Sequence, residues 1–273
     1  MAFDRNLLMC PRASYHSDML MKQLVRNAAV ALTLALSAFA NQSAAADFVD
    51  FKRPAQFIET DVHVLGGINT LVQNYQSKFP QIQNLNMNMG ASLGVGARAV
   101  FGIRGYLGVG TAIDLTVNNN NMDMAIVGSD QLSMSSVFID NRTYQVTVPV
   151  FMSFRFNVDR SVRWNIDLGM YYAYGFAGKQ KQRIYRAEIN EMDELVPQRV
   201  DIKTDYYHSP STFINSFNRG DIGLHLGTSL NFGPHLFVGL QFRVGAKNSA
   251  RKSGVVNPSV HNLNFHGVLG YRF

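Results

Sequence analysis

Hydrophobic and polar residues alternate along most of the chain after residue 57, and the clearest case is the final stretch, 260–273. One face of this stretch is apolar: Leu263, Phe265, Leu269, Tyr271 and Phe273. The other face is polar or glycine: Asn262, Asn264, His266, Gly270 and Arg272. A period of two places successive side chains on opposite faces of an extended strand. The pattern therefore predicts a strand with one apolar and one polar face.

The same alternation recurs in eight stretches, and most of them are long. They are 58–69, 89–101, 104–117, 142–157, 161–177, 221–232, 235–247 and 260–273. A tilted membrane strand needs about 9–11 residues, whereas strands in soluble proteins more often have about 5–6. The lengths therefore favour membrane-spanning strands.

The connections between these strands are alternately short and long. Short turns are expected at 102–103, 158–160 and 233–234, and long loops at about 70–88, 118–141, 178–220 and 248–259. In an up-and-down barrel this order places every long loop at one end. The sequence thus predicts an all-β fold over 58–273: an eight-stranded antiparallel up-and-down transmembrane β-barrel with long extracellular loops and short periplasmic turns.

The bulk of the apolar faces indicates that they point outward, toward lipid. Turned inward, as in a soluble barrel of the lipocalin type, their aromatic side chains would overfill a narrow core. Turned outward, they form the two aromatic girdles expected at membrane interfaces. The girdle residues are Phe101, Tyr144, Phe156, Trp164, Tyr172, Tyr174, Phe232, Tyr271 and Phe273.

The polar faces would then line the lumen, and they carry a set of opposite charges. These residues are Arg98, Arg104, Asp114, Arg155, Arg163, Asp167 and Arg243. One interpretation is an anion pathway. The other is a lumen filled by salt bridges, since an eight-stranded barrel is just wide enough for its own side chains and buried charges must be paired. We favour the filled lumen.

The first 46 residues are predicted to lie outside the barrel. Lys22 and Arg26 precede an apolar run, Ala28–Ala40, and the small-residue site Ala44–Ala46. This is the pattern of a cleaved signal peptide, behind an upstream extension that holds Cys10, the only cysteine. Residues 47–57 would form a periplasmic lead-in. Export across the inner membrane of a Gram-negative-type bacterium, followed by insertion into the outer membrane, is the expected route.

Three segments resemble the PorT-like family of outer-membrane β-barrels, with OmpA-type barrels as wider relatives. Residues 144–156 are similar to the family's aromatic-x-hydrophobic-Pro strand, and 221–227 to its glycine-spaced strand. The terminal Gly270-Tyr-Arg-Phe273 resembles the signal read by the barrel-assembly machinery, carried by Tyr271 and Phe273. The resemblance covers about 59–273. It implies fold and targeting, and it raises a role in a secretion or gliding apparatus without assigning one.

Candidate catalytic and metal-binding residues are scattered. A lipid-modifying enzyme could use His261 with Ser253 or Ser259, or His208 with Ser209. A metal could use His63, His225 and His266, which share the inward face. No spacing is diagnostic, so we expect neither enzymatic activity nor a cofactor or metal. The formal net charge is only +6 and the basic residues are dispersed, which gives no support to nucleic-acid binding.

The longest loop, 178–220, has a basic half, an acidic half and then aromatic residues. It is either a surface for a protein partner or lipopolysaccharide, or a solvated hairpin that extends the strands. The basic segment 246–253 could meet lipid phosphates. We therefore expect a non-enzymatic outer-membrane barrel with a structural or surface-interaction role, in contact with lipid and lipopolysaccharide. A secretion component, a lipid-modifying enzyme and a narrow pore are the alternatives.

Overall fold

The computed structural model describes residues 57–127, 134–159, 161–189, 195–208, 217–251 and 258–273. Its elements are β1 (Ile58–Gln73), α3 (Tyr75–Lys78), β2 (Ile82–Asn88), β3 (Gly90–Arg104), β4 (Leu107–Val127), β5 (Met134–Asn157), β6 (Val162–Ile189), β7 (Leu195–Asp205), β8 (Gly220–Phe232), β9 (Leu236–Gly245) and β10 (Val260–Arg272). The expected signal peptide and all but the last residue of the lead-in lie outside these ranges. Among the described residues, no helix has the length and hydropathy needed to cross a bilayer.

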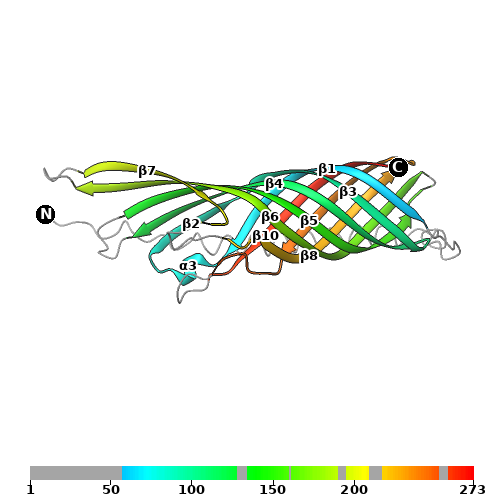
Figure 1. Cartoon of the computed structure of the whole chain (residues 1–273), viewed down its shortest axis with the longest axis horizontal. Helices are drawn as coiled ribbons and strands as arrows, with labels where there is room; N and C mark the ends of the chain where they lie inside the picture. Colours follow the sequence, from blue (N-terminus) through cyan, green and yellow to red (C-terminus); the bar gives the residue numbers. More distant parts are fainter. Residues whose placement is uncertain (1–56, 128–133, 160, 190–194, 209–216, 252–257) are drawn as a thin grey trace. The chain divides into compact units, whose positions relative to one another are not determined.

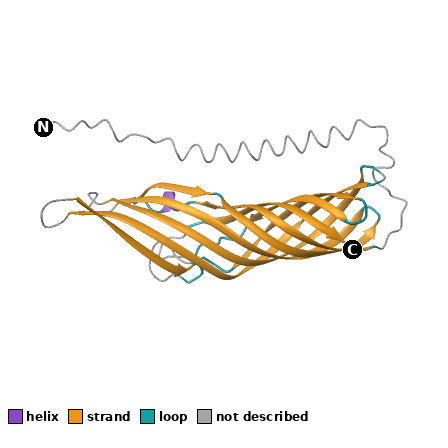
Figure 2. Cartoon of the chain, turned by 90° about the horizontal axis from the view of Figure 1, so that it is seen from above, coloured by secondary structure: helices purple, strands orange, loops and turns teal. Residues whose placement is uncertain are grey.

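Eight of these strands close into an antiparallel barrel (Figures 1 and 2). The ring runs β1, β3, β4, β5, β6, β8, β9, β10 and returns to β1. The closing pair joins the first and last strands, with His63 opposite Gly270 and Asn69 opposite Asn264. The predicted eight-stranded transmembrane barrel is confirmed. Because each strand pairs on both sides, its backbone polar groups are satisfied without water.

The remaining strands, β2 and β7, lengthen the barrel wall at one end. β2 pairs with the far half of β4, and β7 pairs with the far half of β6. Together with the long β4–β5 hairpin they extend the sheet, as the left side of Figure 1 shows. The predicted loops 118–141 and 178–220 are therefore largely strand. The polar residues in these segments, including the run Asn118–Asn121, concealed a period of two that continues past the membrane.

The opposite end carries the short turns, together with the C-terminus (Figure 1). These turns join β3 to β4, β5 to β6 and β8 to β9. Gly233 has a φ of 61°, which a residue with a side chain rarely adopts, so the turn before Pro234 depends on this glycine. We call this the short-turn end and the other the hairpin end.

The apolar faces of the strands point outward. Leu240 and Tyr172 are 48% and 49% exposed, whereas Arg243 on the inner face is 2% exposed. Exposed girdle aromatics lie near the short-turn end (Phe101, Phe232, Tyr271, Phe273) and farther along β6 (Tyr172, Tyr174). Trp164 shares the outward side but is buried, because it packs on Phe156 and donates a hydrogen bond to Thr228 Oγ1. Tyr144 is half-buried against Phe176.

The hairpin end has an apolar core inside the barrel wall, which we call the hairpin core. Its buried members come from β1, α3 and the residue after it, β2, the long hairpins, β10 and the segments after β7 and β9: Leu71, Tyr75, Phe79, Ile82, Met122, Met124, Val137, Ile139, Ile184, Tyr206, Tyr207, Phe217, Ala250 and Val260. Tyr206 stacks on Phe217 with ring centroids 4.4 Å apart. This packing fills the interior beyond the charged part of the lumen.

Candidate functional site

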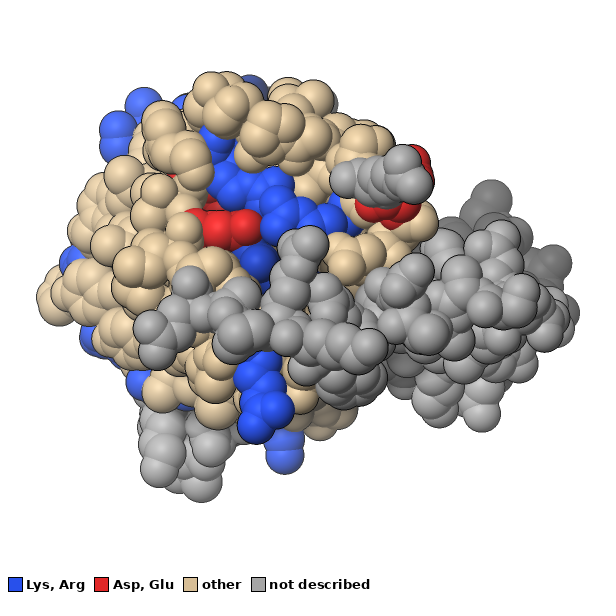
Figure 3. All heavy atoms as spheres, turned by 90° about the vertical axis from the view of Figure 1, so that its right-hand side faces the viewer, with Lys and Arg blue, Asp and Glu red and all other residues tan. Residues whose placement is uncertain are grey.

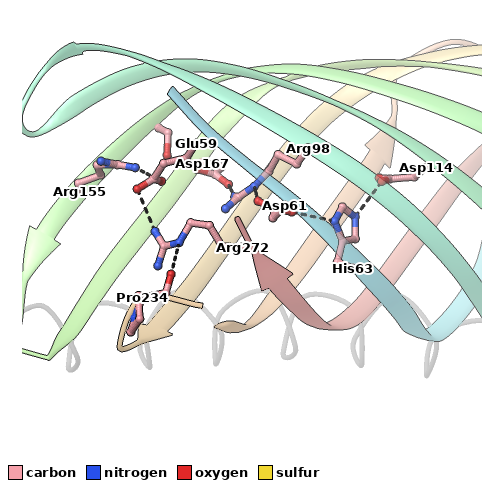
Figure 4. A network of polar contacts seen from close by, with 10 residues as sticks. Glu59, Asp61, His63, Arg98, Asp114, Arg155, Asp167, Pro234 and Arg272 are labelled. Carbon is pink, nitrogen blue, oxygen red and sulfur yellow. Dashed lines mark hydrogen bonds and ion pairs between the residues drawn. The ribbon is translucent and has the colours of Figure 1, made fainter. Parts of the chain in front are cut away.

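The centre of the lumen holds an ion-pair network around Arg98 (Figure 4). Arg98 Nε donates to Asp61 Oδ2 at 2.7 Å, and Nη1 donates to Asp167 Oδ2 at 2.8 Å. Ser153 Oγ donates to the other oxygen of Asp167 at 2.6 Å. All four side chains are buried. Two carboxylates from β1 and β6 thus share one guanidinium from β3, which ties three strands together across the barrel.

A second part of the network surrounds Asp114. His63 lies between two carboxylates, with Nδ1 3.1 Å from Asp61 and Nε2 2.9 Å from Asp114. Arg243 donates from Nη2 to the second oxygen of Asp114 and from Nε to His225 Nδ1, at 3.3 Å in the latter case. Figure 4 shows His63 between Asp61 and Asp114. The charges in the middle of the lumen are therefore paired rather than arranged along an open path.

A third cluster lies nearest the short-turn end, around Glu59. Arg272 Nη1 donates to Glu59 Oε1 at 2.9 Å, and Arg155 Nη2 forms an ion pair with Oε2. Arg163 Nη1 lies 3.5 Å from Oε1. We call Glu59, Arg155, Arg163 and Arg272 the mouth cluster. It contains three guanidinium groups and one carboxylate.

The structure brings together most of the lumen residues expected from the sequence. Arg98, Asp114, Arg155, Asp167 and Arg243 are buried inside, and Arg163 stands half-exposed at the mouth. Arg104 does not join them and is exposed at the turn. The pairing of β3 with β4 shifts between Gly102 and Arg104, and this irregularity interrupts the alternation on which its placement depended.

The charge network also contains four residues that were not expected in it from the sequence: Glu59, Asp61, His63 and Arg272. The sequence did carry a signal for three of them, because Glu59, Asp61 and His63 occupy alternate positions in β1. Arg272 lies opposite Asp61 in the closed barrel. The signal was obscured because 58–69 has the weakest alternation of the eight stretches. The pairing of β1 with β10 is what places these residues near one another.

The three candidate metal-binding histidines are buried but occupied by other contacts. His266 Nε2 lies 2.7 Å from Ser92 Oγ, and His225 accepts a hydrogen bond from Arg243. Within the described ranges no group of three or more histidine, cysteine or acidic residues is arranged to hold a metal ion. These histidines therefore belong to the hydrogen-bonding network of the lumen.

Among the candidate catalytic residues, Ser259 and His261 lie together. Ser259 Oγ is 2.8 Å from His261 Nε2, and Nδ1 of the same ring is 3.1 Å from the backbone oxygen of Gly245. The third position of a serine–histidine triad is thus a backbone carbonyl and not a carboxylate. Ser209 and Ser253 lie outside the described residues.

The outer surface of the hairpin end carries a strip of aromatic and cationic side chains, which we call the hairpin strip: half-buried Phe138 and exposed Arg183, Tyr185 and Arg199. The Phe138 and Tyr185 rings meet edge to face with centroids 5.7 Å apart. Arg183 lies 6.0 Å from the centre of the Phe138 ring, and Arg199 lies 5.9 Å from that of Tyr185. Asp140 and Asp201 pair with the two arginines. The strip spans three adjacent strands, β5, β6 and β7.

A closed barrel with an apolar outer belt and a charged interior defines a transmembrane β-barrel protein. Residues 40–251 match the outer membrane protein beta-barrel domain family. The chain belongs to this family, and it is a protein of the outer membrane. A comparison with curated proteins finds no match.

Several solved outer-membrane barrels are similar in structure, at low identity. OprG of Pseudomonas aeruginosa is 13% identical, with a TM-score of 0.37, 78% of this chain covered and 95% of OprG. Neisserial surface protein A is 11% identical, with a TM-score of 0.35 and coverage of 78% and 97%. Ail, the attachment invasion locus protein of Yersinia pestis, is 12% identical, with a TM-score of 0.33 and coverage of 79% and 98%. At these values the likenesses carry no conclusion about what this chain binds.

Proposed function

We propose that this outer-membrane barrel is a non-enzymatic surface protein that binds a protein partner through the hairpin strip. The observation that carries the proposal is the continuation of β5 and β6 beyond the girdle into an extended sheet. The inner side of this sheet packs on the hairpin core, and its outer side exposes the strip. Arginine and tyrosine are enriched in protein interfaces, and they are enriched among the few residues that carry most of the binding energy.

The proposal includes the orientation of the barrel. The short-turn end would face the periplasm and the hairpin end the exterior, after export by the signal peptide and insertion by the barrel-assembly machinery. The side chains of Tyr271 and Phe273 are 48% and 73% exposed, which supports the proposal that they form the assembly signal. The hairpin end would meet lipopolysaccharide. We also propose that this protein is a PorT-like barrel, because the sequence of 144–156 is similar to the aromatic-x-hydrophobic-Pro strand of that family.

The filled lumen favours a structural role for the barrel over a role as a pore. The cavity beside Arg98 and Asp167 has a volume of about 10 Å³, enough for roughly one water molecule. Toward the hairpin end the interior is occupied by the hairpin core. A protein with this interior is expected to carry no steady current across a planar bilayer.

Site-specific photo-crosslinking in intact cells tests the partner proposal. A crosslinker placed at Tyr185 should give one defined protein adduct, and the same group at Asn121, which is exposed on β4, should not. Replacing Arg183 and Arg199 by alanine should abolish the adduct at a reporter on Phe138 while the barrel remains folded. Equal, diffuse adducts from Tyr185 and Asn121 would contradict the proposal.

A further inference from the structure

We propose that the outer wall of the barrel, just beyond the aromatic girdle, binds the phosphate groups of lipopolysaccharide. The site consists of four cationic side chains, which we call the headgroup band: Arg142, Lys179, Lys181 and Lys203. It lies on β5, β6 and β7, between the girdle and the hairpin strip. The inference rests on the orientation proposed above, in which this end of the barrel emerges from the outer leaflet, and it goes beyond the protein partner of the strip.

Strand pairing brings the four cations of the headgroup band together on one face. Arg142 lies opposite Lys179, and Lys181 lies opposite Lys203. Lys179 and Lys181 are two positions apart on β6, so their side chains point to the same side. All four residues are exposed, whereas Gln180 between the two lysines is buried. The band therefore occupies the outer surface, within about 10 Å across the strands and about 7 Å along them.

The positive charges of the headgroup band are not neutralised by the protein. Lys181 and Lys203 face each other on adjacent strands, and like charges directly opposite one another destabilise a sheet. Among the described residues, neither these two lysines nor Lys179 forms an ion pair. Arg142 donates from Nε to the neutral side chain of Asn119, at 2.9 Å. An anion bound between the lysines would remove the repulsion.

The acidic side chains on the same outer face are occupied by other groups. Asp140 and Asp201 form ion pairs with the two arginines of the hairpin strip, at 3.0 and 2.8 Å. Asp205, which lies opposite Lys179, accepts a hydrogen bond on Oδ1 from the backbone N–H of Tyr207 at 2.8 Å. The band consequently retains its positive charge and is complementary to an anion.

The headgroup band lies at the depth where lipid phosphates are found. The rings of Tyr144 and Phe176, whose centroids are 6.2 Å apart, mark the girdle on β5 and β6. Arg142 is two residues past Tyr144, about 7 Å farther along the strand. Aromatic girdles sit at the level of the headgroups, and cationic side chains beside a membrane attract anionic lipids. Lipopolysaccharide is the anionic lipid of the outer leaflet, so we infer that it is the occupant.

The charges at the short-turn end are arranged differently. Figure 3 shows Lys and Arg atoms next to Asp or Glu atoms at the centre of this end face, and the arginines of the mouth cluster pair with Glu59 there. These groups belong to the lumen. The headgroup band, in contrast, stands on the outer side of the extended wall that Figure 1 shows at the left.

Microscale thermophoresis of the full-length protein in detergent micelles tests the inference with two probes. One is a diphosphorylated lipid A, and the other is the same lipid A after chemical removal of its phosphates. The wild type should bind the phosphorylated probe saturably and at least about ten-fold more tightly than the dephosphorylated probe. Equal affinities for the two probes, or no saturable binding of the phosphorylated one, would overturn the inference.

Substitution of the three lysines tests whether the headgroup band is the site. Replacing Lys179, Lys181 and Lys203 together by glutamine should weaken binding of the phosphorylated probe about 100-fold, since each cation near a charged surface contributes about five-fold. Replacing the same three residues by arginine preserves the charges and should preserve the affinity. The glutamine variant leaves the hairpin strip unchanged, so it should retain the crosslinked adduct at Tyr185 in cells. Failure of that adduct in the wild type would overturn the partner proposal alone.

The matched control removes three exposed cations that lie outside the headgroup band. Lys78→Gln, Arg104→Gln and Arg186→Gln in one chain change the net charge by the same amount as the band variant. The control should bind the phosphorylated probe as the wild type does. If the control and the glutamine variant of the band lose affinity equally, net charge alone governs binding and the inference is wrong.

Discussion

Glu59 and Arg272 are 213 positions apart in sequence and 2.9 Å apart in the barrel. They stand on the first and last strands, at the seam where the sheet closes on itself. The contact forms only when β1 has met β10, so it reports closure of the whole barrel. The lumen network continues from this seam through Asp61 and Arg98 to the opposite wall.

The paired charges of the lumen predict that removing one partner is costly. Arg98→Met leaves Asp61 and Asp167 buried beside each other without their shared cation, and we expect a loss of about 3–5 kcal/mol in the free energy of unfolding. Urea unfolding of the protein in lipid vesicles would measure it. Arg199→Met, at an exposed pair, should leave the unfolding midpoint where it is. Equal midpoints for the two variants would show that the network contributes nothing.

The outward apolar belt predicts a dependence on depth. Leu240 lies midway along β9 and Leu236 at its short-turn end, and both face outward. Leu240→Arg should lower the free energy of unfolding by about 2–4 kcal/mol, and Leu236→Arg by about 0–1. The same vesicle unfolding experiment gives both values. A larger effect at Leu236 than at Leu240 would contradict the placement of the belt.

The close approach of Tyr207 to Gly175 predicts that this glycine cannot be replaced. The hydroxyl and ring of Tyr207 occupy the space that a side chain at Gly175 would need. Gly175→Ala should displace Tyr207 and destabilise the hairpin core by about 1–3 kcal/mol. Faster amide hydrogen exchange at the hairpin end would record this. Gly66→Ala is the control, because the nearest atom to a Cβ there is 3.8 Å away, on Leu93.

The buried tyrosines of the hairpin core predict a loss of stability at high pH. Burial raises the pKa of Tyr207 from 10.0 to about 12 and holds the pKa of Tyr206 well above its usual range. In the unfolded chain these hydroxyls ionise near pH 10 while the folded form stays neutral. The stabilisation is therefore complete below pH 10 and is lost as the pH rises toward 12. Tyrosinate absorbance during a pH titration should show delayed ionisation in the wild type, and Tyr207→Phe should remove one delayed step.

The Ser259–His261 pair gives a test of the non-enzymatic proposal. If the pair is an ordinary polar contact, Ser259→Ala leaves the acyl chains of lipid A unchanged, as seen by mass spectrometry of lipid A from cells with and without the substitution. Ser229→Ala, inside the lumen, serves as the comparison. An acyl chain that is missing from lipid A of wild-type cells and retained in cells with Ser259→Ala would establish an acyl hydrolase.

The sequence by itself determined the barrel, its eight strands and the direction of its two faces. A period of two is a local property, and the contrast between bulky apolar residues and small or charged ones is readable in each strand alone. Residues such as Leu240 and Arg243 were assigned to opposite faces without knowledge of any neighbour.

Only the tertiary structure decided which charges meet and how far the walls continue. Glu59 and Asp61 lie in the weakest stretch of alternation, and their partners Arg155, Arg272 and Arg98 come from other strands, so strand register and closure had to be known first. The shift between Gly102 and Arg104 is likewise a property of two paired strands. The lengthening of the wall by β4, β5, β6 and β7 depended on the hairpin core. Strands with polar outer faces are stabilised beyond the membrane only by apolar side chains that pack on their inner side.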